Sequence, residues 1–468
     1  MAEKQFLQCA EIPASREALW RWHTRPGAFE RLSPPWENVQ LASGDITIAD
    51  GEQATIELRK HGVKQKWVAE HFDVAPGAQF RDRQLAGPFA FWEHLHRFDA
   101  GASPHQSMLV DEIRYRLPVS PLSDWVAGSY ARKQLEAMFA YRHWVTAGDL
   151  ARFGRWFAED PPPPRRVLIT GMSGLIGTAL RPLLRSLGWE VRGLSRQADP
   201  STNTFAWDPE RGELDLAALQ GVDIVIHLAG ANIAGGRWTP DRRKLLRESR
   251  ERPTRLLAEK LAAHVPPAAA FISMSGASCY PFGPEAHTED GPLGDSFLAE
   301  VVQAWETATR LAASAGWRTV HLRTGMVLTP RGGALAKMLP AFNLGAGGPV
   351  GSGEQHWSWI GLHDLLDLII TAATDSSYRG AVNAVAPQSV SSREFGQTLG
   401  KVLRRPAFAP LSTPVVKALF GSMGNETLLA DNRVVPAKLQ EQGFRYRTPE
   451  LETCFRVLLG RPPLPDDS

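Results

Sequence analysis

The chain has 468 residues, more than one hydrophobic core usually serves, so we expect two or three domains. Apolar residues make up 43% of it and charged residues 22%, and the net charge is only +2, which argues against a nucleic-acid partner. No run approaches the roughly 18–20 apolar residues that a membrane span requires.

Cysteine usage and the first residues indicate a compartment. Cys9, Cys279 and Cys454 are odd in number and far apart, so no disulfide framework is implied, and a reducing environment fits. The opening MAEKQFLQCAEIPAS lacks the apolar stretch of a signal peptide. We therefore expect a cytoplasmic protein with no membrane partner.

Residues 1–150 contain a strand, a helical segment, several alternating strands and one long helix. KQFLQCAEI is the first strand, Ser15 can cap the helical SREALWRWH, and DWVAGSYARKQLEAMFAYRHWVTAGDL is the long helix. An antiparallel sheet wrapped around such a helix leaves an apolar cavity. This order, with the phrase GPFAFWEHLHRF, resembles the START-like helix-grip domains known also from polyketide cyclases. The resemblance implies an apolar ligand in that cavity.

Three histidines of this region raise the question of a metal. His94 and His96 alternate along one strand and so share a face, and His71 lies on a preceding strand. Three histidines from a sheet could bind zinc. Since no acidic or thiol partner is near them in sequence, we interpret them as a hydrogen-bonded or partly exposed face and predict no metal.

A proline-rich segment follows. We assign residues 151–165 to a linker, because the four prolines in EDPPPPRR favour a stiff, extended spacer. The predicted domains after it are a dinucleotide-binding domain at 166–405 and a small C-terminal domain at 406–468.

From residue 166 onward strands and helices alternate, which predicts a doubly wound parallel sheet. In RRVLITGMSGLIGTAL the glycines Gly171, Gly174 and Gly177 come directly after the first strand and open the first helix. The first permits a tight turn, the second lets a pyrophosphate approach, and the third lets the helix pack on the strand. In this context the motif indicates a dinucleotide site.

The end of the second strand distinguishes the two nicotinamide dinucleotides. NAD sites usually carry an acidic residue there, but here GLSRQ places Ser195 and Arg196 at that position. A guanidinium can pair with a 2′-phosphate. Asp199 lies too far along to substitute for the acid. We therefore predict NADP, the alternative being that Arg196 is a solvated loop residue.

Several motifs in this half carry a family resemblance. GMSGLIG, HLAGA, SMSGAS and LRTGMVL, in this order, resemble the extended short-chain dehydrogenase/reductase superfamily. More narrowly, GGRWTPDRRKLLRESRERPT, GAGGPVGSGEQHWSWIGLHDL and LLADNRVVPAKLQEQGF resemble an epimerase-like subfamily with its own C-terminal domain. With the three glycines, Ser195 and Arg196, the predicted cofactor contacts are Ser173, Leu175, Ile176, Leu228, Ala229, Gly230, Arg323, Thr324 and Gly325.

The superfamily's chemistry needs a serine or threonine and a YxxxK pair. Ser275, at the end of AAFISMSGA, stands about where the serine belongs. If Glu306 matches the glutamate that commonly follows the pair, its two positions hold Leu298 and Val302. A register shifted by one places Phe297 and Val301 there instead, so neither register supplies the tyrosine or lysine.

Three interpretations remain open for the missing relay. In the first, another group replaces it. Tyr280 is the nearest phenol, although it is equally well explained as a packed aromatic, and His287, Glu289 and Glu306 are further candidates. Alternatively, the acid comes from substrate or water. The third interpretation is that the domain binds NADP(H) without turnover.

Two further segments are candidates for a substrate pocket. By family resemblance Trp238 and Arg250 approach the substrate, although the helical run 242–255 is otherwise a solvated face with paired charges. The loop GAGGPVGSGEQHWSWI at 345–360 lacks GK[ST] and is not a Walker loop. We predict that it lines a pocket through Gln355 and Trp357.

Together these observations predict an α/β Rossmann fold, with an N-terminal α+β helix-grip domain and a small C-terminal cap. The predicted function is an NADP-dependent oxidoreductase or epimerase-like enzyme acting on a small-molecule substrate. The alternative is a non-catalytic NADP(H)-binding redox sensor with an apolar-ligand module. The sequence leaves the oligomeric state open.

Overall fold

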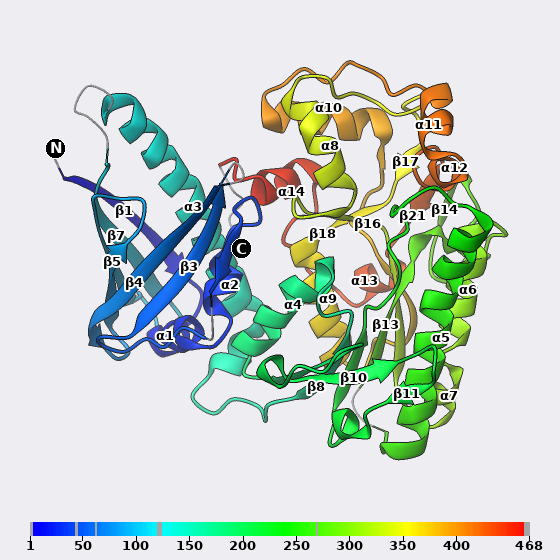
Figure 1. The fold of residues 1–468 in the computed structure, drawn as a ribbon, viewed down its shortest axis with the longest axis horizontal. Helices are drawn as coiled ribbons and strands as arrows, with labels where there is room; N and C mark the ends of the chain where they lie inside the picture. The colour runs from blue at the N-terminus through cyan, green and yellow to red at the C-terminus, as the bar shows by residue number, and fades with distance from the viewer. Residues whose placement is uncertain (1–2, 43–44, 61–62, 119–123, 268–269, 463–468) are drawn as a thin grey trace. The chain divides into compact units, whose positions relative to one another are not determined.

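The fold is that of a computed structural model, which describes residues 3–42, 45–60, 63–118, 124–267 and 270–462 (Figure 1). The chain divides into two compact units. The first comprises Met1–Pro164, Arg181–Trp189 and Arg456–Ser468, and the second comprises Arg165–Leu180 and Glu190–Phe455.

The first unit contains a seven-stranded antiparallel sheet in the order β1-β7-β6-β5-β4-β3-β2. Its strands are β1 (Lys4–Ile12), β2 (Val39–Leu41), β3 (Gln53–Lys60), β4 (Val63–Ala75), β5 (Gln79–Ala86), β6 (Phe91–Ala100) and β7 (Ser107–Arg116). Its helices are α1 (Arg16–Thr24), α2 (Ala28–Leu32) and the long α3 (Asp124–Phe153).

The long helix α3 packs on this sheet through apolar side chains. Phe6 of β1, Trp92 of β6 and Ile113 of β7 share one buried cluster with Leu135 and Phe139 of α3. The predicted helix-grip fold is therefore confirmed. The predicted cap of α1 is confirmed too, because the Ser15 hydroxyl accepts a hydrogen bond from the Ala18 backbone N–H at 3.2 Å.

Ordered structure extends into the segment assigned to the linker. Helix α3 runs to Phe153, and the 3₁₀ turn η1 (Gly154–Phe157) follows it directly. Trp156 and Phe157 of this turn are buried. Residues 161–165, which include the four prolines, carry no regular secondary structure.

The second unit contains an eight-stranded sheet in the order β11-β10-β9-β8-β12-β13-β15-β19, parallel except at the β11 edge. The strands are β8 (Arg166–Thr170), β9 (Glu190–Ser195), β10 (Thr204–Asp208), β11 (Glu213–Leu214), β12 (Ile224–His227), β13 (Ala270–Gly276), β15 (Thr319–Thr324) and β19 (Gly380–Ala384). The main helices are α4 (Leu175–Ser186), α5 (Pro240–His264), α6 (Phe297–Thr307), α7 (Arg310–Ser314) and α9 (Leu362–Thr374).

This strand order confirms the predicted Rossmann fold. The first strand, β8, lies at the centre, and the chain proceeds outward to one side through β9 and β10 before it crosses to β12. The switch point is therefore between β8 and β12, and dinucleotides bind in the crevice outside the strand ends at such a point.

Smaller elements surround the sheet's carboxyl edge. β14 (Gly283–His287) pairs with β21 (Asn432–Val434), a strand of the C-terminal region. The others are α8 (Gly333–Asn343), β16 (Met326–Leu328), β17 (His356–Trp357), β18 (Trp359–Gly361), β20 (Val390–Ser391), α10 (Ser392–Leu403), α11 (Thr413–Phe420), α12 (Ser422–Thr427), α13 (Ala437–Glu441) and α14 (Leu451–Leu458). In the described part of the chain, no helix has both the length and the apolarity to cross a membrane.

Candidate dinucleotide and active site

The three glycines form a tight turn between β8 and α4. Gly171 has a φ of +71°, and a Cβ there would lie 2.9 Å from the backbone carbon of Leu228 in the neighbouring strand end. A Cβ on Gly177 would lie 2.5 Å from the Gly171 oxygen. At Gly174 an added Cβ would meet, among the described residues, only that same oxygen, at 3.1 Å. The space above Gly174 is thus free for a phosphate, and the N-terminus of α4 faces it.

The other loop residues lie around this turn. Ser173 is exposed, Leu175 and Ile176 are half-buried at the start of α4, and Gly230 is exposed after β12. Thr324 turns its hydroxyl to the Leu322 carbonyl at 2.9 Å. Gly325 is required for close packing, because a Cβ there would lie 2.5 Å from the Ser358 oxygen.

Arg196 stands exposed immediately after β9, whose last residue, Ser195, is exposed as well. Within the described residues the structure gives Arg196 no hydrogen bond or ion pair. Asp199, in contrast, is engaged: its carboxylate accepts hydrogen bonds from the Ser201 and Thr202 hydroxyls at 2.6 and 3.0 Å. The available charge at this strand end is therefore positive.

A buried histidine that the sequence analysis did not consider links the two strand ends at the switch point. His227 Nδ1 lies 2.6 Å from the Thr170 hydroxyl, and Nε2 lies 2.8 Å from the Thr254 hydroxyl. Thr254 donates its proton to the Arg250 carbonyl, so His227 must donate from Nε2 and accept from Thr170. Thr170 Oγ1 then accepts from the Leu228 backbone N–H at 3.2 Å. Burial lowers the pKa of His227 to about 3, and the nearby Arg250 charge adds to this effect.

Arg250 supports the loop after β12 from below. Its Nη1 donates to the Leu246 carbonyl at 3.0 Å and its Nη2 to the Ala231 carbonyl at 3.1 Å. The guanidinium lies 5.1 Å from the Trp305 ring centroid. Burial lowers the pKa of Arg250 to about 10. An arginine so bound positions the loop backbone.

Ser275 meets a charged pair at the end of β13. Its hydroxyl donates to Glu306 Oε1 at 2.7 Å. The same carboxylate accepts two hydrogen bonds of 2.9 Å from Arg323, one to each oxygen. Burial raises the pKa of Glu306, but the hydrogen bonds and charge of Arg323 outweigh it and hold the pKa below its usual value.

Tyr280 is fully buried on the other side of Arg323. Its hydroxyl accepts from Arg323 Nη1 at 2.9 Å and donates to Asn383 Oδ1 at 2.7 Å, and its ring stacks on His287. Burial raises the pKa of this phenol above its usual range. Glu289 borders the network and accepts from the Asn383 backbone N–H at 3.0 Å. The sequence placed these groups in one region but could not indicate their pairing.

The candidate positions for the superfamily's tyrosine and lysine are apolar in both registers. In the first register, Leu298 packs with Trp238 and Met423, and Val302 lies against Gly276. In the second register, Phe297 is half-buried and Val301 is buried.

The residues predicted to contact substrate are turned inward. The Trp238 indole donates to the Ile233 carbonyl at 3.0 Å. Gln355 donates to the Val350 and Leu428 carbonyls, each at 2.9 Å, and the Trp357 indole donates to the Leu428 carbonyl at 3.2 Å. The structure thus brings Gln355 and Trp357 together at the end of α12.

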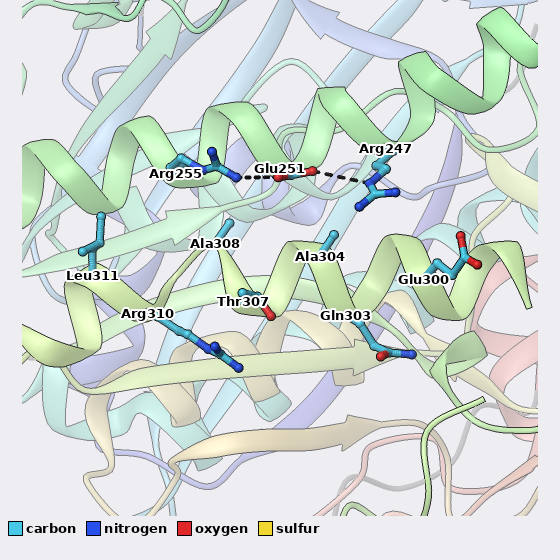
Figure 2. A pocket seen from close by; sticks show the side chains of 10 residues that line it. All are labelled: Arg247, Glu251, Arg255, Glu300, Gln303, Ala304, Thr307, Ala308, Arg310 and Leu311. Atoms are coloured by element: carbon cyan, nitrogen blue, oxygen red, sulfur yellow. Dashed lines mark hydrogen bonds and ion pairs between the residues drawn. The ribbon is translucent and has the colours of Figure 1, made fainter. Parts of the chain in front are cut away.

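A groove of about 650 Å³ lies between α5 and the α6–α7 segment (Figure 2). Arg247 and Arg255 of α5 both pair with Glu251, which confirms the predicted i,i+4 pairs on this helix. Glu300 and Gln303 line the facing side. None of the residues predicted to bind cofactor or substrate lines this groove.

The first unit holds a cavity of about 590 Å³ between its sheet and α3. Most of its wall is apolar and includes Ile56, Trp67 and Phe89. His71, Asp82, His94 and His96 are among the polar residues of the wall, which also include His23, Gln134 and Arg142.

A doubly wound sheet with a glycine-rich turn at its switch point defines a dinucleotide-binding protein. Comparison with known proteins is consistent with this class. The NAD dependent epimerase/dehydratase family matches residues 167–384, the domain of unknown function DUF1731 matches 412–458, and the polyketide cyclase/dehydrase and lipid transport family matches 12–140.

Curated relatives and solved structures agree. Epimerase family protein SDR39U1 of Homo sapiens is 38% identical over 298 residues, which are 63% of this chain and 99% of that protein. A structure of the nucleoside-diphosphate sugar epimerase from Corynebacterium glutamicum has a TM-score of 0.78 and 32% identity, over 97% of this chain and 90% of that one. The structure of human SDR39U1 isoform 2 with NADPH has a TM-score of 0.58 and 37% identity, over 63% of this chain and 98% of that one.

The chain therefore belongs to the NAD dependent epimerase/dehydratase family, and it carries a DUF1731 domain and an N-terminal polyketide cyclase-type domain.

Proposed function

We propose that this protein is an NADP(H)-dependent oxidoreductase or epimerase-like enzyme acting on a small molecule. The observation that carries the proposal is the charge at the end of β9, where Arg196 is exposed while Asp199 is held within its own turn. Of the charged groups described at this strand end, the Arg196 guanidinium is then the one available to the 2′-position of a dinucleotide whose phosphates lie on the Gly174 turn, with the exposed Ser195 hydroxyl beside it. The NADPH bound to human SDR39U1 supports this choice.

The cofactor would supply a hydride, and Ser275 would hold the reacting oxygen. Because the Ser275 proton is donated to Glu306, the lone pairs of Oγ are left to accept a hydrogen bond from a substrate hydroxyl. Arg323 fixes Glu306 through two hydrogen bonds, and Tyr280 braces Arg323 from the other side. In this arrangement Tyr280 is a positioning residue.

A second candidate function is a non-catalytic NADP(H)-binding sensor. Leu298 and Val302 are apolar where a proton relay would stand, and the Ser275–Glu306–Arg323 network is internally paired. In either function the N-terminal cavity, with its apolar wall, would take an apolar ligand.

The two functions are separated by following NADPH oxidation against a panel of carbonyl compounds and sugar nucleotides. Enzymatic function predicts turnover with at least one substrate, and Ser275→Ala should lower kcat by about 10²–10⁴-fold. Tyr280→Phe should cost stability, by about 1–3 kcal/mol, because it leaves Asn383 without a donor. Tight NADPH binding without turnover on any substrate would favour the sensor. Turnover unaffected by Ser275→Ala would contradict the role given to Ser275.

A further inference from the structure

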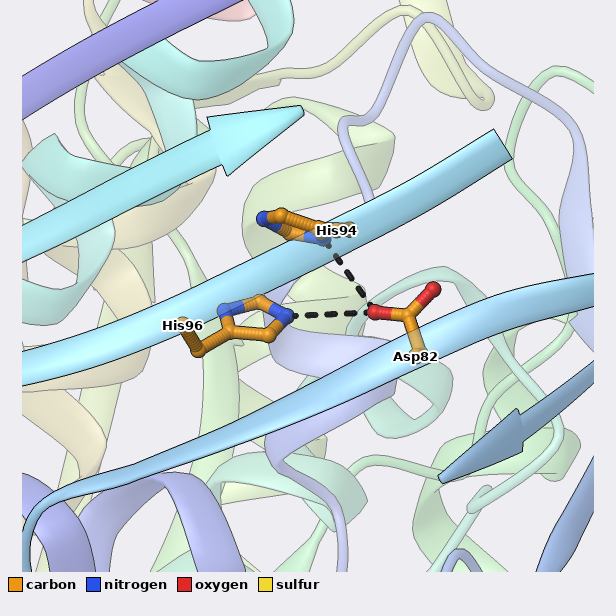
Figure 3. A group of neighbouring side chains, drawn as sticks. All are labelled: Asp82, His94 and His96. Atoms are coloured by element: carbon orange, nitrogen blue, oxygen red, sulfur yellow. Dashed lines mark ion pairs between the residues drawn. The ribbon is translucent and has the colours of Figure 1, made fainter. Parts of the chain in front are cut away.

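The wall of the N-terminal cavity carries a polar cluster that the proposed function does not use, formed by Asp82, His94 and His96 (Figure 3). Strands β5 and β6 pair so that Asp82 lies directly opposite His94, and His96 follows on the same face. The three side chains are only 15%, 3% and 12% exposed. Buried polar groups of this kind require partners.

The spacing of the three groups suits a metal ion. His94 Nδ1 lies 3.2 Å from Asp82 Oδ2, and His96 Nε2 lies 3.5 Å from the same oxygen. One ligand atom from each of the three residues lies within 4.8 Å of the others. Bonds of about 2.0–2.2 Å at tetrahedral angles separate ligand atoms by roughly 3.3–3.6 Å. The two distances to Asp82, 3.2 and 3.5 Å, lie at or close to that range.

The far nitrogens of both rings face one carboxylate on β7. Asp111 Oδ1 forms a hydrogen bond of 2.9 Å with His94 Nε2, and it lies 2.8 Å from His96 Nδ1 without hydrogen-bond geometry. His143 of α3 contacts the other Asp111 oxygen at 2.6 Å. A carboxylate on the outer nitrogen of a metal-bound imidazole fixes the tautomer and orients the ring. Asp111 therefore directs the His94 ring toward Asp82.

Charge and an unpartnered histidine point the same way. Asp82 and Asp111 bring two negative charges to this site, and among the described residues Arg142 is a cation on which both act. The remaining negative charge is balanced either by a bound cation or by a proton on His94, whose pKa these two carboxylates raise against the effect of burial. His71 lines the same cavity at 7% exposure, and among the described residues its Nδ1 has no hydrogen-bond partner. The cavity therefore offers a ligand an additional buried polar atom.

We propose that Asp82, His94 and His96 bind one divalent transition-metal ion, such as Zn²⁺ or Co²⁺, with an open coordination position in the cavity. Two imidazoles and one carboxylate suit these ions better than Mg²⁺ or Ca²⁺, which prefer oxygen ligands. Three protein ligands leave a position for water or an oxygen of a bound molecule. The ion would thus anchor an apolar ligand by an oxyanion. The sequence-based prediction of no metal did not take Asp82 into account, because Asp82 comes close to the histidines only through the pairing of β5 with β6.

The test is a titration of tag-free, chelator-treated full-length protein with Co²⁺, followed by its visible absorption, and then competition with Zn²⁺. We expect one equivalent per chain. Asp82→Asn and His96→Gln should each weaken binding by more than the roughly 10–100-fold expected when an outer partner is lost, and Asp111→Asn should fall within that range. Glu93→Gln is the matched control, since Glu93 adjoins His94 but pairs with Arg81.

Circular dichroism and thermal melting of each variant separate loss of metal from loss of fold. Metal loss in a folded Asp82→Asn variant, with binding kept in Glu93→Gln, supports the site. Substoichiometric binding to the unmodified protein, or unchanged affinity in folded Asp82→Asn, would overturn the proposal.

Discussion

We propose that single side chains at the end of β9 determine which dinucleotide binds. Arg196 is exposed there, next to Ser195. The Asp199 carboxylate instead accepts hydrogen bonds at the start of the 3₁₀ turn η2 (Pro200–Thr202). At the switch point a single side chain, His227, joins Thr170 of β8 to Thr254 of α5 by hydrogen bonds. The first feature concerns which dinucleotide binds, and the second keeps the strand ends in place beneath it.

Arg196→Asp should reverse the cofactor preference. Replacing the guanidinium by a carboxylate removes a charge-assisted pair with the 2′-phosphate and adds repulsion, whereas a 2′-hydroxyl can bond to the new acid. We expect NADPH binding to weaken at least tenfold more than NADH binding, measured by fluorescence titration of both cofactors. Arg211→Asp, an exposed arginine after β10, is the control. Equal titration curves for the two cofactors in the unmodified protein would contradict the assignment.

The His227 ring should remain neutral at pH values well below the ordinary histidine pKa of 6.5. Its folded-state pKa of about 3 lies below the ordinary 6.5, so the unfolded chain binds more protons between these values. The free energy of unfolding therefore rises with pH between about 3 and 6.5. The stabilisation from the neutral His227 is complete above about pH 6.5 and is lost as pH falls toward 3. Nitrogen-15 NMR, with the signal assigned by its absence in His227→Gln, should show an Nε2-protonated ring that does not titrate between pH 8 and 5. Titration near pH 6.5 would refute the buried network.

Some residues of the candidate site could be predicted from the sequence, and others could not. The positions of the glycines and of Arg196 were predictable because a βαβ motif places the glycines after its first strand and Arg196 at the end of its second strand. The pairing of Ser275 with Glu306 joins residues 31 positions apart, and that of Asp82 with His94 depends on strand register. Neither spacing follows a helical or strand period, so no local pattern indicates these pairs.

At the scale of elements, the glycines in the turn between β8 and α4 have different structural roles. Gly177 lets the helix lie on the turn, while Gly174 leaves the turn open to a ligand. In helix α6, Leu298 and Val302 are buried apolar side chains at the positions where one of the two expected registers would place a tyrosine and a lysine. The alternation of strands and helices predicted the fold, whereas the inward turn of Gln355 and Trp357 depends on α12, which lies about 70 residues further on.

Gly174→Ala and Gly177→Ala should therefore fail in different ways. A methyl at Gly177 would lie 2.5–2.7 Å from three backbone atoms of residues 171 and 172, which cannot move aside independently. We expect a loss of about 1–3 kcal/mol in the free energy of unfolding. Gly174→Ala should keep its melting temperature but bind NADPH at least tenfold more weakly, because the methyl occupies the phosphate's approach. A destabilised Gly174→Ala that still binds NADPH normally would contradict this division.

At the scale of the whole molecule, the proline run predicts a boundary but not which residues each unit contains. The first compact unit includes Arg181–Trp189, which come after the run and contain the second half of α4. Sequence patterns place α4 in the Rossmann fold because of its glycine-rich start. The C-terminal half of α4 and the residues after it belong to the first unit through tertiary contacts, such as that between Trp156 and Trp189.

Cutting the chain at the prolines should accordingly weaken the N-terminal unit. Trp189 is 4% exposed and packs edge-to-face on Trp156, with ring centroids 5.1 Å apart. Removing such a buried aromatic typically costs about 3–5 kcal/mol. We expect the amides of β6 and β7 to exchange hydrogen faster in a 1–164 fragment than in the full chain, and Trp189→Ala in the full chain should reproduce this. Trp317→Ala, at a buried tryptophan of the second unit, should not. Equal protection in fragment and full chain would show that residues 1–164 form a complete folding unit.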